Sequence, residues 1–158
     1  MSKVCVLGAG TMGAGIAQTF ASNGFQVVLR DIKQEFVDRG LETINKNINR
    51  LCSKGKITAE QANKILSNVQ GTIDITQAKD CILVVEAAVE NMAIKRTIFA
   101  ELDKVCDKTT IFATNTSSLS ITEVATSTSR PDQVIGMHFF NPAPVMKLVE
   151  IIKGITTS

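Results

Sequence analysis

The sequence of 158 residues contains no tryptophan, no tyrosine and only one histidine, His138. The absence of tyrosine excludes the tyrosine/lysine mechanism of short-chain dehydrogenases, which needs a phenolic hydroxyl to transfer the proton. Imidazole is the side chain that ordinarily changes its charge near neutral pH. Acid–base chemistry in this chain is therefore expected to depend on His138.

The sequence also has little net charge and no long apolar run. Its 17 basic and 15 acidic residues are scattered and give a formal net charge of +2, which argues against a nucleic-acid partner. A membrane helix needs about 20 apolar residues, and neither such a run nor the apolar stretch of a signal peptide is found. We expect one soluble, cytoplasmic domain that acts on a small molecule, with no nucleic-acid or membrane partner.

The four cysteines lack the CxxC spacing of metal and redox motifs. Two of them lie inside apolar runs that resemble strands, where a small hydrophobic side chain is suitable. We expect Cys5, Cys52, Cys81 and Cys106 to be reduced and structural, and we predict no metal site.

Short apolar runs alternate with helical patterns along the chain. Strands are expected at residues 3–7, 26–30, 68–73, 81–87, 110–114, 134–139 and 148–152. Helices are expected after the first strand as far as Asn23, over 92–105, and as a hairpin of two helices over 33–67, whose second helix begins with a capping box of Thr58 and Gln61. The order predicts an α/β, Rossmann-like, doubly wound and mostly parallel sheet, with the helical hairpin inserted after the second strand. The last two strands are expected to pair antiparallel at one sheet edge or to extend the sheet.

The loop after the first strand has the sequence Gly8-Ala9-Gly10-Thr11-Met12-Gly13, a GxGxxG motif between a strand and a helix. Gly8 permits the tight turn, Gly10 lets a pyrophosphate approach the backbone, and Gly13 lets the helix pack closely. Asp31, at the end of the second strand, is placed to accept hydrogen bonds from the adenosine ribose, which favours NAD over NADP. Alternatively, the glycines only make a turn and Asp31 caps the next helix. The neighbouring Arg30 leaves NADP as a second alternative for the cofactor.

Further candidate residues follow the predicted strand 81–87, because ligands of open parallel sheets bind beyond the carboxyl ends of the strands. Ala88 is small enough to let a cofactor approach closely. Glu90 and Lys95 could flank the cofactor, or could form a solvated pair at the start of a helix.

Two polar residues follow the predicted strand 110–114. Asn115 and Ser117 could hydrogen-bond a nicotinamide or a substrate oxygen. They could equally be turn and N-cap residues of the next helix.

The last two predicted strands carry His138 and Glu150. A base that removes a hydroxyl proton while hydride leaves the same carbon must work near ambient pH, and a carboxylate beside the imidazole would orient it and stabilise its charged form. If the turn at 141–144 folds the strands together, the two residues could meet as a catalytic dyad. The alternative is a core histidine and an exposed strand glutamate.

The motifs GAGTMG, VVEAAVEN, TNTSSLSIT and GMHFFNPAPVMKLVEI together resemble the 3-hydroxyacyl-CoA dehydrogenase family, most closely its bacterial members that act on 3-hydroxybutyryl-CoA. The resemblance covers essentially the whole chain. It implies NAD-dependent oxidation of L-3-hydroxyacyl-CoA to 3-ketoacyl-CoA, or the reverse, as in fatty-acid breakdown or butyrate-type fermentation.

The resemblance also implies roles for single residues. It makes His138 the general base, Glu150 its partner, and Ser117 a contact of the substrate oxygen near the nicotinamide. The cofactor-binding residues are then Gly8, Gly10, Thr11, Met12, Gly13, Asp31, Ala88, Glu90, Lys95, Asn115, Ser117 and Asn141.

An acyl-CoA partner fits the basic part of the helical hairpin. Between Thr43 and Ala59 the charged residues are all basic, which suits the phosphates of coenzyme A, and they are Lys46, Arg50, Lys54 and Lys56. The family's spacing points to Asn47 and Lys54, with Ser117, as substrate-binding residues. The alternative is an ordinary basic, solvated helix face.

In domain terms, residues 1–158 are expected to form the NAD-binding domain. The resemblance implies a second, all-helical domain that closes the substrate cleft and makes a homo-oligomer, and this domain is not in the sequence. Without it the thioester would stay hydrated and loosely positioned, so we expect the chain to bind NAD but to turn over poorly.

Two other functions remain open from the sequence. The chain could be a non-catalytic NAD-binding module, although such a module has no chemical need for His138, Glu150 and Ser117. It could also oxidise a small free hydroxy acid, against which the basic hairpin argues.

Overall fold

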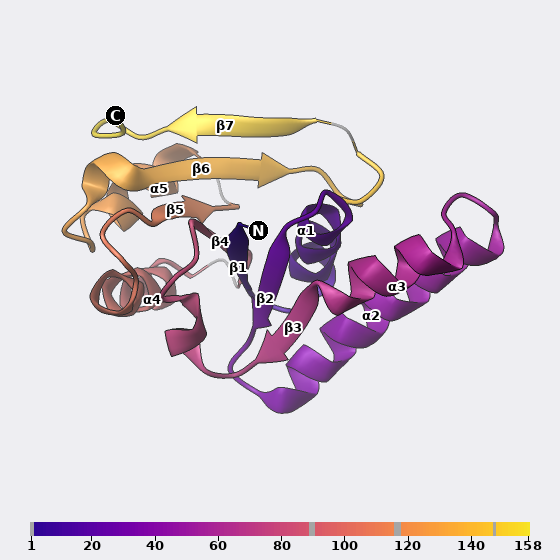
Figure 1. Ribbon diagram of the computed structural model, residues 1–158. Coiled ribbons are helices and arrows are strands. Elements are labelled where there is room, and N and C mark those ends of the chain that lie inside the picture. The colour runs from indigo at the N-terminus through magenta and orange to yellow at the C-terminus, as the bar shows by residue number, and fades with distance from the viewer. Residues whose placement is uncertain (1, 89–90, 116–117, 147) are drawn as a thin grey trace.

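The computed structural model describes residues 2–88, 91–115, 118–146 and 148–158 (Figure 1). A seven-stranded sheet has the order β3-β2-β1-β4-β5-β6-β7, and its strands are parallel except for β7, which pairs antiparallel with β6. The strands are β1 (Lys3–Leu7), β2 (Gln26–Arg30), β3 (Val69–Thr72), β4 (Leu83–Glu86), β5 (Ile111–Thr114), β6 (Val134–Phe139) and β7 (Val149–Lys153). The first six strands follow the doubly wound order, so the predicted fold class is confirmed.

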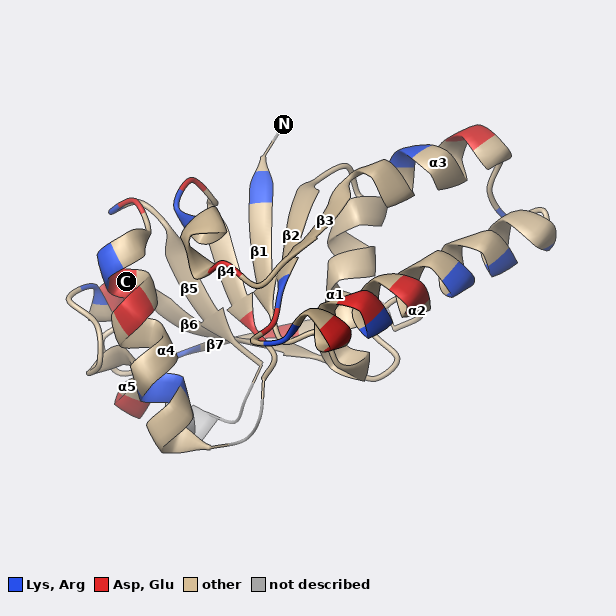
Figure 2. Cartoon of the chain, turned by 90° about the horizontal axis from the view of Figure 1, so that it is seen from below, with Lys and Arg blue, Asp and Glu red and all other residues tan. Residues whose placement is uncertain are grey.

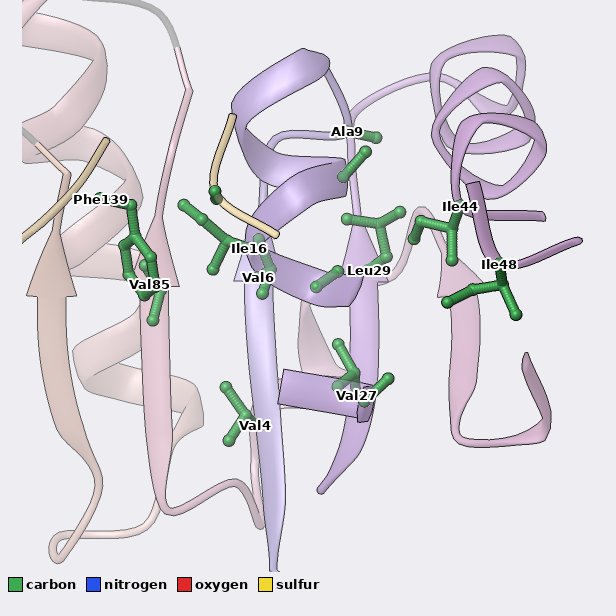
Figure 3. Close-up of a cluster of buried hydrophobic side chains, with 14 of the residues drawn as sticks. Val4, Val6, Ala9, Ile16, Val27, Leu29, Ile44, Ile48, Val85 and Phe139 are labelled. Atoms are coloured by element: carbon green, nitrogen blue, oxygen red, sulfur yellow. The ribbon is translucent and has the colours of Figure 1, made fainter. Parts of the chain in front are cut away.

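Helices cover both faces of the sheet (Figure 1). They are α1 (Thr11–Ser22), α2 (Gln34–Ser53), α3 (Ala59–Ser67), α4 (Met92–Val105) and α5 (Ser118–Ala125), with short 3₁₀ helices at Ile75–Ala78 and Pro131–Gln133. The strands alternate between two hydrophobic clusters, because successive side chains point to opposite faces. Val4 and Val6 pack with α1 and α2 (Figure 3), whereas Cys5 and Leu7 pack with α4 and α5.

The helical hairpin is formed as predicted by α2 and α3, and its tip extends beyond the sheet (Figure 1). The turn between them contains Gly55, whose φ of +72° lies in the left-handed region that favours glycine. Thr58 and Gln61 exchange the two hydrogen bonds of the predicted capping box, at 3.1 and 2.8 Å. The short connection at the tip of the hairpin therefore contains a glycine turn after α2 and the cap of α3.

The predicted strands were too long in places. The strand predicted at 81–87 is β4, Leu83–Glu86, because the amide of Cys81 bonds to the carbonyl of Ala78 and so still belongs to the preceding turn. The strand predicted at 68–73 is shortened to Val69–Thr72. The 3₁₀ helices were not predicted, since each is too short to show a hydrophobic period.

All four cysteines are free thiols. Burial raises the pKa of Cys81 to about 12 and that of Cys106 to about 11, and it raises the pKa of Cys5 well above its ordinary value. Such thiols stay protonated at neutral pH and are poor nucleophiles. Within the described ranges no group of histidine, cysteine, aspartate and glutamate side chains could hold a metal ion. The structure agrees with a packing role for the cysteines.

None of the helices in the described part of the chain combines the length and the apolar character needed to cross a bilayer.

Candidate active site

The glycine loop joins β1 to α1. Gly8 has a φ of +99°, and a Cβ there would approach the carbonyl oxygen of Ala87 to 2.9 Å. A Cβ at Gly13 would overlap the carbonyl oxygen of Gly8, so the first turn of α1 can lie on the loop only without a side chain. Thr11 and Met12 are the first residues of α1, whose amides have no partner within the helix.

Gly10 differs from the other two glycines of the motif. It is exposed, and no atom lies within 4 Å of the position that a Cβ would take. The backbone at Gly10 is therefore open to a ligand that approaches the N-terminus of α1, where the helix dipole and free amides favour an anion.

Asp31 is bonded to the glycine loop. Its Oδ2 accepts the amide of Ala9 at 2.8 Å and its Oδ1 accepts the amide of Ile32 at 2.7 Å. The alternative in which Asp31 caps the next helix is wrong, because the N-cap of α2 is Lys33. A carboxylate has about four acceptor positions, so Asp31 can still accept hydrogen bonds from two hydroxyl groups of a ribose.

Asp31 and the loop line a groove of about 450 Å³, whose walls are Gly8, Ala9, Gly10, Thr11, Asp31, Ile32, Phe36, Arg39, Thr43, Ala87 and Ala88. Sequence reasoning missed the α2 residues of this groove. The sequence feature that could have indicated them is the spacing of Phe36, Arg39 and Thr43, which places all three on one face of α2. Gly40 lies between them in the sequence. A Cβ at Gly40 would approach the carbonyl oxygen of Ala9 to 2.9 Å, so this face of α2 lies on the glycine loop.

The side chain of Arg30, the other charged residue at the end of β2, bonds to a residue outside the glycine loop. Its Nε donates to the carbonyl oxygen of Ile73 at 3.1 Å, whereas the carboxylate of Asp31 bonds to the loop. The groove is therefore lined by the acidic residue of this pair, which disfavours a cofactor with an extra ribose phosphate.

Replacing Asp31 with asparagine is expected to raise the Kd for NAD by about tenfold or more, because a hydrogen bond to a charged acceptor contributes about 1.5–3 kcal/mol. The asparagine oxygen can still accept the Ala9 amide, so the fold should persist. Calorimetry with NAD and with NADP measures both affinities. Asp38→Asn is the matched control, since it makes the same change on the exposed face of α2. Equal NAD affinity in the two variants would contradict the ribose role.

A buried ion pair lies beneath the Ala87–Ala88 wall of the groove. Glu86 is 0% and Lys95 is 2% exposed, and Nζ lies 2.6 Å from Oε1. Oε1 also accepts the hydroxyl of Thr114 at 2.7 Å, and Oε2 accepts the amide of Ala88 at 2.6 Å. The carboxylate thus joins the ends of β4 and β5 to the groove wall and to α4. The interpretation of Lys95 as part of a solvated pair is wrong.

Glu86 was not among the predicted site residues, although it directly follows a buried run. A carboxylate is almost never fully buried unless it is paired, and its partner is nine positions away on the next helix, beyond any local pattern. Glu90 and Ser117, which were predicted to lie near the cofactor and substrate, fall outside the described residues.

Lys95→Met is expected to lower the free energy of unfolding by about 3–5 kcal/mol, because it leaves the Glu86 carboxylate buried without its cation. Lys104→Met, an exposed position on the same helix, is the matched control and should change stability by less than about 0.5 kcal/mol. The double variant Glu86→Gln, Lys95→Met should recover part of the loss. Urea unfolding measures all three, and a Lys95→Met effect no larger than the control would disprove the buried-pair account.

His138 and Glu150 are register partners in the antiparallel pair β6–β7. Directly opposed residues have Cβ atoms about 4.5–5.5 Å apart on the same face of the sheet, so the predicted meeting across the strands is confirmed at the level of register. His138 is half-buried, its ring forms a T-shaped pair with Phe140 at a centroid distance of 4.8 Å, and Glu150 is exposed. Within the described residues, no hydrogen bond joins the two side chains. The imidazole is accessible rather than a core residue.

The two asparagines predicted to bind the cofactor, Asn115 and Asn141, lie near the end of β6. The Oδ1 of Asn115 accepts the amide of Phe139 at 2.9 Å, so Asn115 contacts the strand that carries His138. Asn141 is exposed in the loop after β6, and its peptide bond to Pro142 is cis.

The site residues lie at the same end of the sheet, where the parallel strands have their carboxyl ends. Asp31 follows β2 and His138 lies near the carboxyl end of β6, four strands away in the sheet order. At about 4.8 Å per strand this is about 19 Å, comparable with the length of an extended dinucleotide. This end of the sheet can therefore hold the adenosine near β2 and the reactive ring near β5 and β6.

Asn47 and Lys54 lie together at a second groove of about 410 Å³, lined by Gln18, Asn47, Arg50, Leu51, Lys54, Lys56, Pro142, Pro144 and Val145. The groove thus lies between the basic part of the hairpin and the loop after β6. The basic positions along α2 are blue in Figure 2. Asn47 donates to the side-chain oxygen of Gln18 at 3.0 Å. Lys46, the other basic residue of the segment, pairs with Glu42 at 3.2 Å.

The chain matches known proteins over its whole length. The family model described as "3-hydroxyacyl-CoA dehydrogenase, NAD binding domain" matches residues 3–158. Among curated proteins, the chain is 53% identical over 99% of its length to a 3-hydroxybutyryl-CoA dehydrogenase from Clostridioides difficile, of which it covers 56%. It is 46% identical over 100% of its length to a 3-hydroxyadipyl-CoA dehydrogenase from Escherichia coli, of which it covers 33%.

Solved structures agree. A 3-hydroxybutyryl-CoA dehydrogenase from Escherichia coli superposes with a TM-score of 0.97 at 45% identity, with 99% of this chain and 33% of that chain covered. An (S)-3-hydroxybutyryl-CoA dehydrogenase from Ralstonia eutropha gives 0.96 at 44% identity, with 100% and 56% covered. The chain spans about half the length of several of the curated relatives it matches.

Proposed function

The chain belongs to the 3-hydroxyacyl-CoA dehydrogenase family as its NAD-binding domain, and from this premise we propose that it carries the dinucleotide site and the catalytic base of an enzyme that interconverts L-3-hydroxyacyl-CoA and 3-ketoacyl-CoA. The four-carbon pair 3-hydroxybutyryl-CoA and acetoacetyl-CoA is the proposed substrate. Relatives at 53% and 49% identity bear the name 3-hydroxybutyryl-CoA dehydrogenase, which supports this choice.

The residues present fit NAD. The backbone at Gly10 is open where a pyrophosphate would approach, and the Asp31 carboxylate keeps free acceptor positions at the same groove. Bound NAD supplies a nicotinamide carbon that accepts or returns the hydride. The glycine loop, Asp31 and Ala88 would hold it, together with Thr11 and Met12 at the N-terminus of α1.

His138 is proposed to remove the proton of the 3-hydroxyl group during oxidation, and to return it during reduction. Glu150, its register partner on β7, would orient the imidazole. Ser117 is proposed to bind the substrate oxygen, and Glu90 to lie near the cofactor. The assignment of His138 as the base depends mainly on one observation. The strand register pairs His138 with Glu150 near the carboxyl end of β6.

The basic groove at the hairpin is proposed to hold the phosphates of coenzyme A. Arg50, Lys54 and Lys56 line it, and Asn47 can supply an amide. The groove reaches the loop that follows β6, so an acyl thioester anchored there could extend toward His138. A free hydroxy acid would leave these cations without a role.

The test is the oxidation of NADH, followed by absorbance, with acetoacetyl-CoA and with free acetoacetate as alternative substrates. It is run on the isolated chain and on a fusion to the unmatched part of the Clostridioides difficile relative, since the chain covers 56% of that protein. We expect the fusion to reduce acetoacetyl-CoA and to prefer it strongly over acetoacetate. Preference for acetoacetate would support a free-acid dehydrogenase. NAD binding without turnover in the fusion would support a non-catalytic module.

A further inference from the structure

The strand that carries His138 extends past its parallel neighbour. β5 ends at Thr114, which is in register with Gly136, whereas β6 continues to Phe139. Beyond Gly136, β5 offers no further strand backbone to bond with β6. The amide of Phe139 is nevertheless paired, because the side-chain oxygen of Asn115 accepts it at 2.9 Å. Asn115 thus continues the β5–β6 ladder with its side chain.

This contact holds the residue next to the proposed base. Phe139 is 5% exposed, and its ring belongs to the cluster shared with α1 (Figure 3). On the opposite side of β6, Phe139 pairs with Val149, beside the His138–Glu150 pair. The backbone at Phe139 is therefore fixed by the buried ring of Phe139, by the pairing with β7 and by the bond to Asn115.

Asn115 is itself held firmly. Its backbone amide donates to the backbone carbonyl oxygen of Glu86 at 2.9 Å. The hydroxyl of the preceding residue, Thr114, donates to the buried Glu86 carboxylate at 2.7 Å. Glu86 also bonds the amide of Ala88 in the groove wall. Asn115 therefore connects the dinucleotide groove to the strand of the base.

We propose that Asn115 is a positioning residue that sets the orientation of His138 by accepting the amide hydrogen of Phe139. The inference rests on the proposed role of His138 as the base. Asn115 keeps its side-chain N–H groups and a second lone pair on its oxygen, so this bond does not exclude a contact with a cofactor or substrate. Small displacements of a reacting group, of about 1 Å, can cost about 100-fold in rate, so a lost strand contact can matter at this position.

The structure offers two informative variants and a matched control. Asn115→Leu removes the acceptor and leaves the Phe139 amide unpaired, whereas Asn115→Asp keeps an acceptor oxygen but removes the amide N–H groups. Gln133→Ala is the control, because Gln133 bonds the carbonyl oxygens of Lys108 and Thr110, at 2.9 and 3.1 Å, near the other end of the same strand pair.

The first readout is the NMR signal of the imidazole in the isolated, tag-free chain, which has a single histidine. We expect Asn115→Leu to shift and broaden the imidazole signals, and Asn115→Asp and Gln133→Ala to leave one sharp set. An unchanged imidazole signal in a folded Asn115→Leu variant would overturn the proposal. Since this readout needs no turnover, it tests the inference even if the fusion proves inactive and the proposed function fails.

The second readout is the kinetics of the fusion with acetoacetyl-CoA. We expect Asn115→Leu to lower kcat by about 10- to 100-fold with less than a threefold change in the KM for NADH, and Asn115→Asp to recover most of the loss. Gln133→Ala should lower thermal stability without lowering kcat. If Asn115→Asp is as impaired as Asn115→Leu and the KM for NADH rises in both, Asn115 is a cofactor contact and the positioning role is wrong.

Discussion

Replacing His138 with glutamine in the fusion is expected to lower kcat for acetoacetyl-CoA reduction by about 10²–10⁴-fold, the usual contribution of a general acid or base. Glutamine can still form hydrogen bonds but cannot take up or release the proton. No second imidazole is present in the chain to replace it. The Kd for NAD should change little, because the groove at the glycine loop does not include His138. Steady-state kinetics and calorimetry on the same protein separate the two effects.

Glu150→Gln supplies the companion variant. Because Glu150 is proposed to act through His138, its loss should lower kcat by less than the loss of the imidazole, and the double variant should be no slower than His138→Gln alone. Independent, multiplicative losses in the double variant would show that the two residues do not work as a pair.

Gly13→Ala is expected to abolish measurable NAD binding and to lower the free energy of unfolding by about 1–3 kcal/mol or more, since the new methyl group overlaps the Gly8 carbonyl oxygen and the backbone must move. The movement displaces the loop and the helix N-terminus together, which removes the anion site. Calorimetry with NAD and urea unfolding of the isolated chain measure the two losses.

Gly10→Ala is the matched comparison in the same motif. Its Cβ meets no protein atom within 4 Å, and its φ of −72° is available to alanine. Stability should fall by no more than about 1 kcal/mol, the usual change at an N-cap, while NAD affinity should still drop because the methyl group occupies the space for the pyrophosphate. If Gly10→Ala binds NAD normally, the dinucleotide does not cross the loop at this point.

The sequence predicted most of the features that depend on local patterns. The glycine loop, the capping box of α3 and the strands β1, β2 and β6 could be read from turn residues and hydrophobic period. The pairing of His138 with Glu150 could also be predicted, because a short turn between two strands limits the register to a few choices.

The remaining contacts depend on partners that are distant in the sequence. Asp31 was expected to face a ribose, but its bond to the Ala9 amide requires the loop and β2 to be placed side by side. The burial of Lys95 follows from Glu86 on a neighbouring strand, and a basic residue on a helix gives no local sign of burial. Asn115 was considered a cofactor contact or a turn residue, and its bond to Phe139 appears only when β5 and β6 are aligned.

The most direct test is a crystal structure of the unsubstituted fusion with NAD and acetoacetyl-CoA bound, because both are in their oxidised form and no hydride transfer can take place between them. We expect one imidazole nitrogen of His138 to lie within about 2.6–3.2 Å of the C3 oxygen of the bound thioester, with the Glu150 carboxylate on the other side of the ring. A C3 oxygen bound beside the nicotinamide but out of reach of His138 would contradict it.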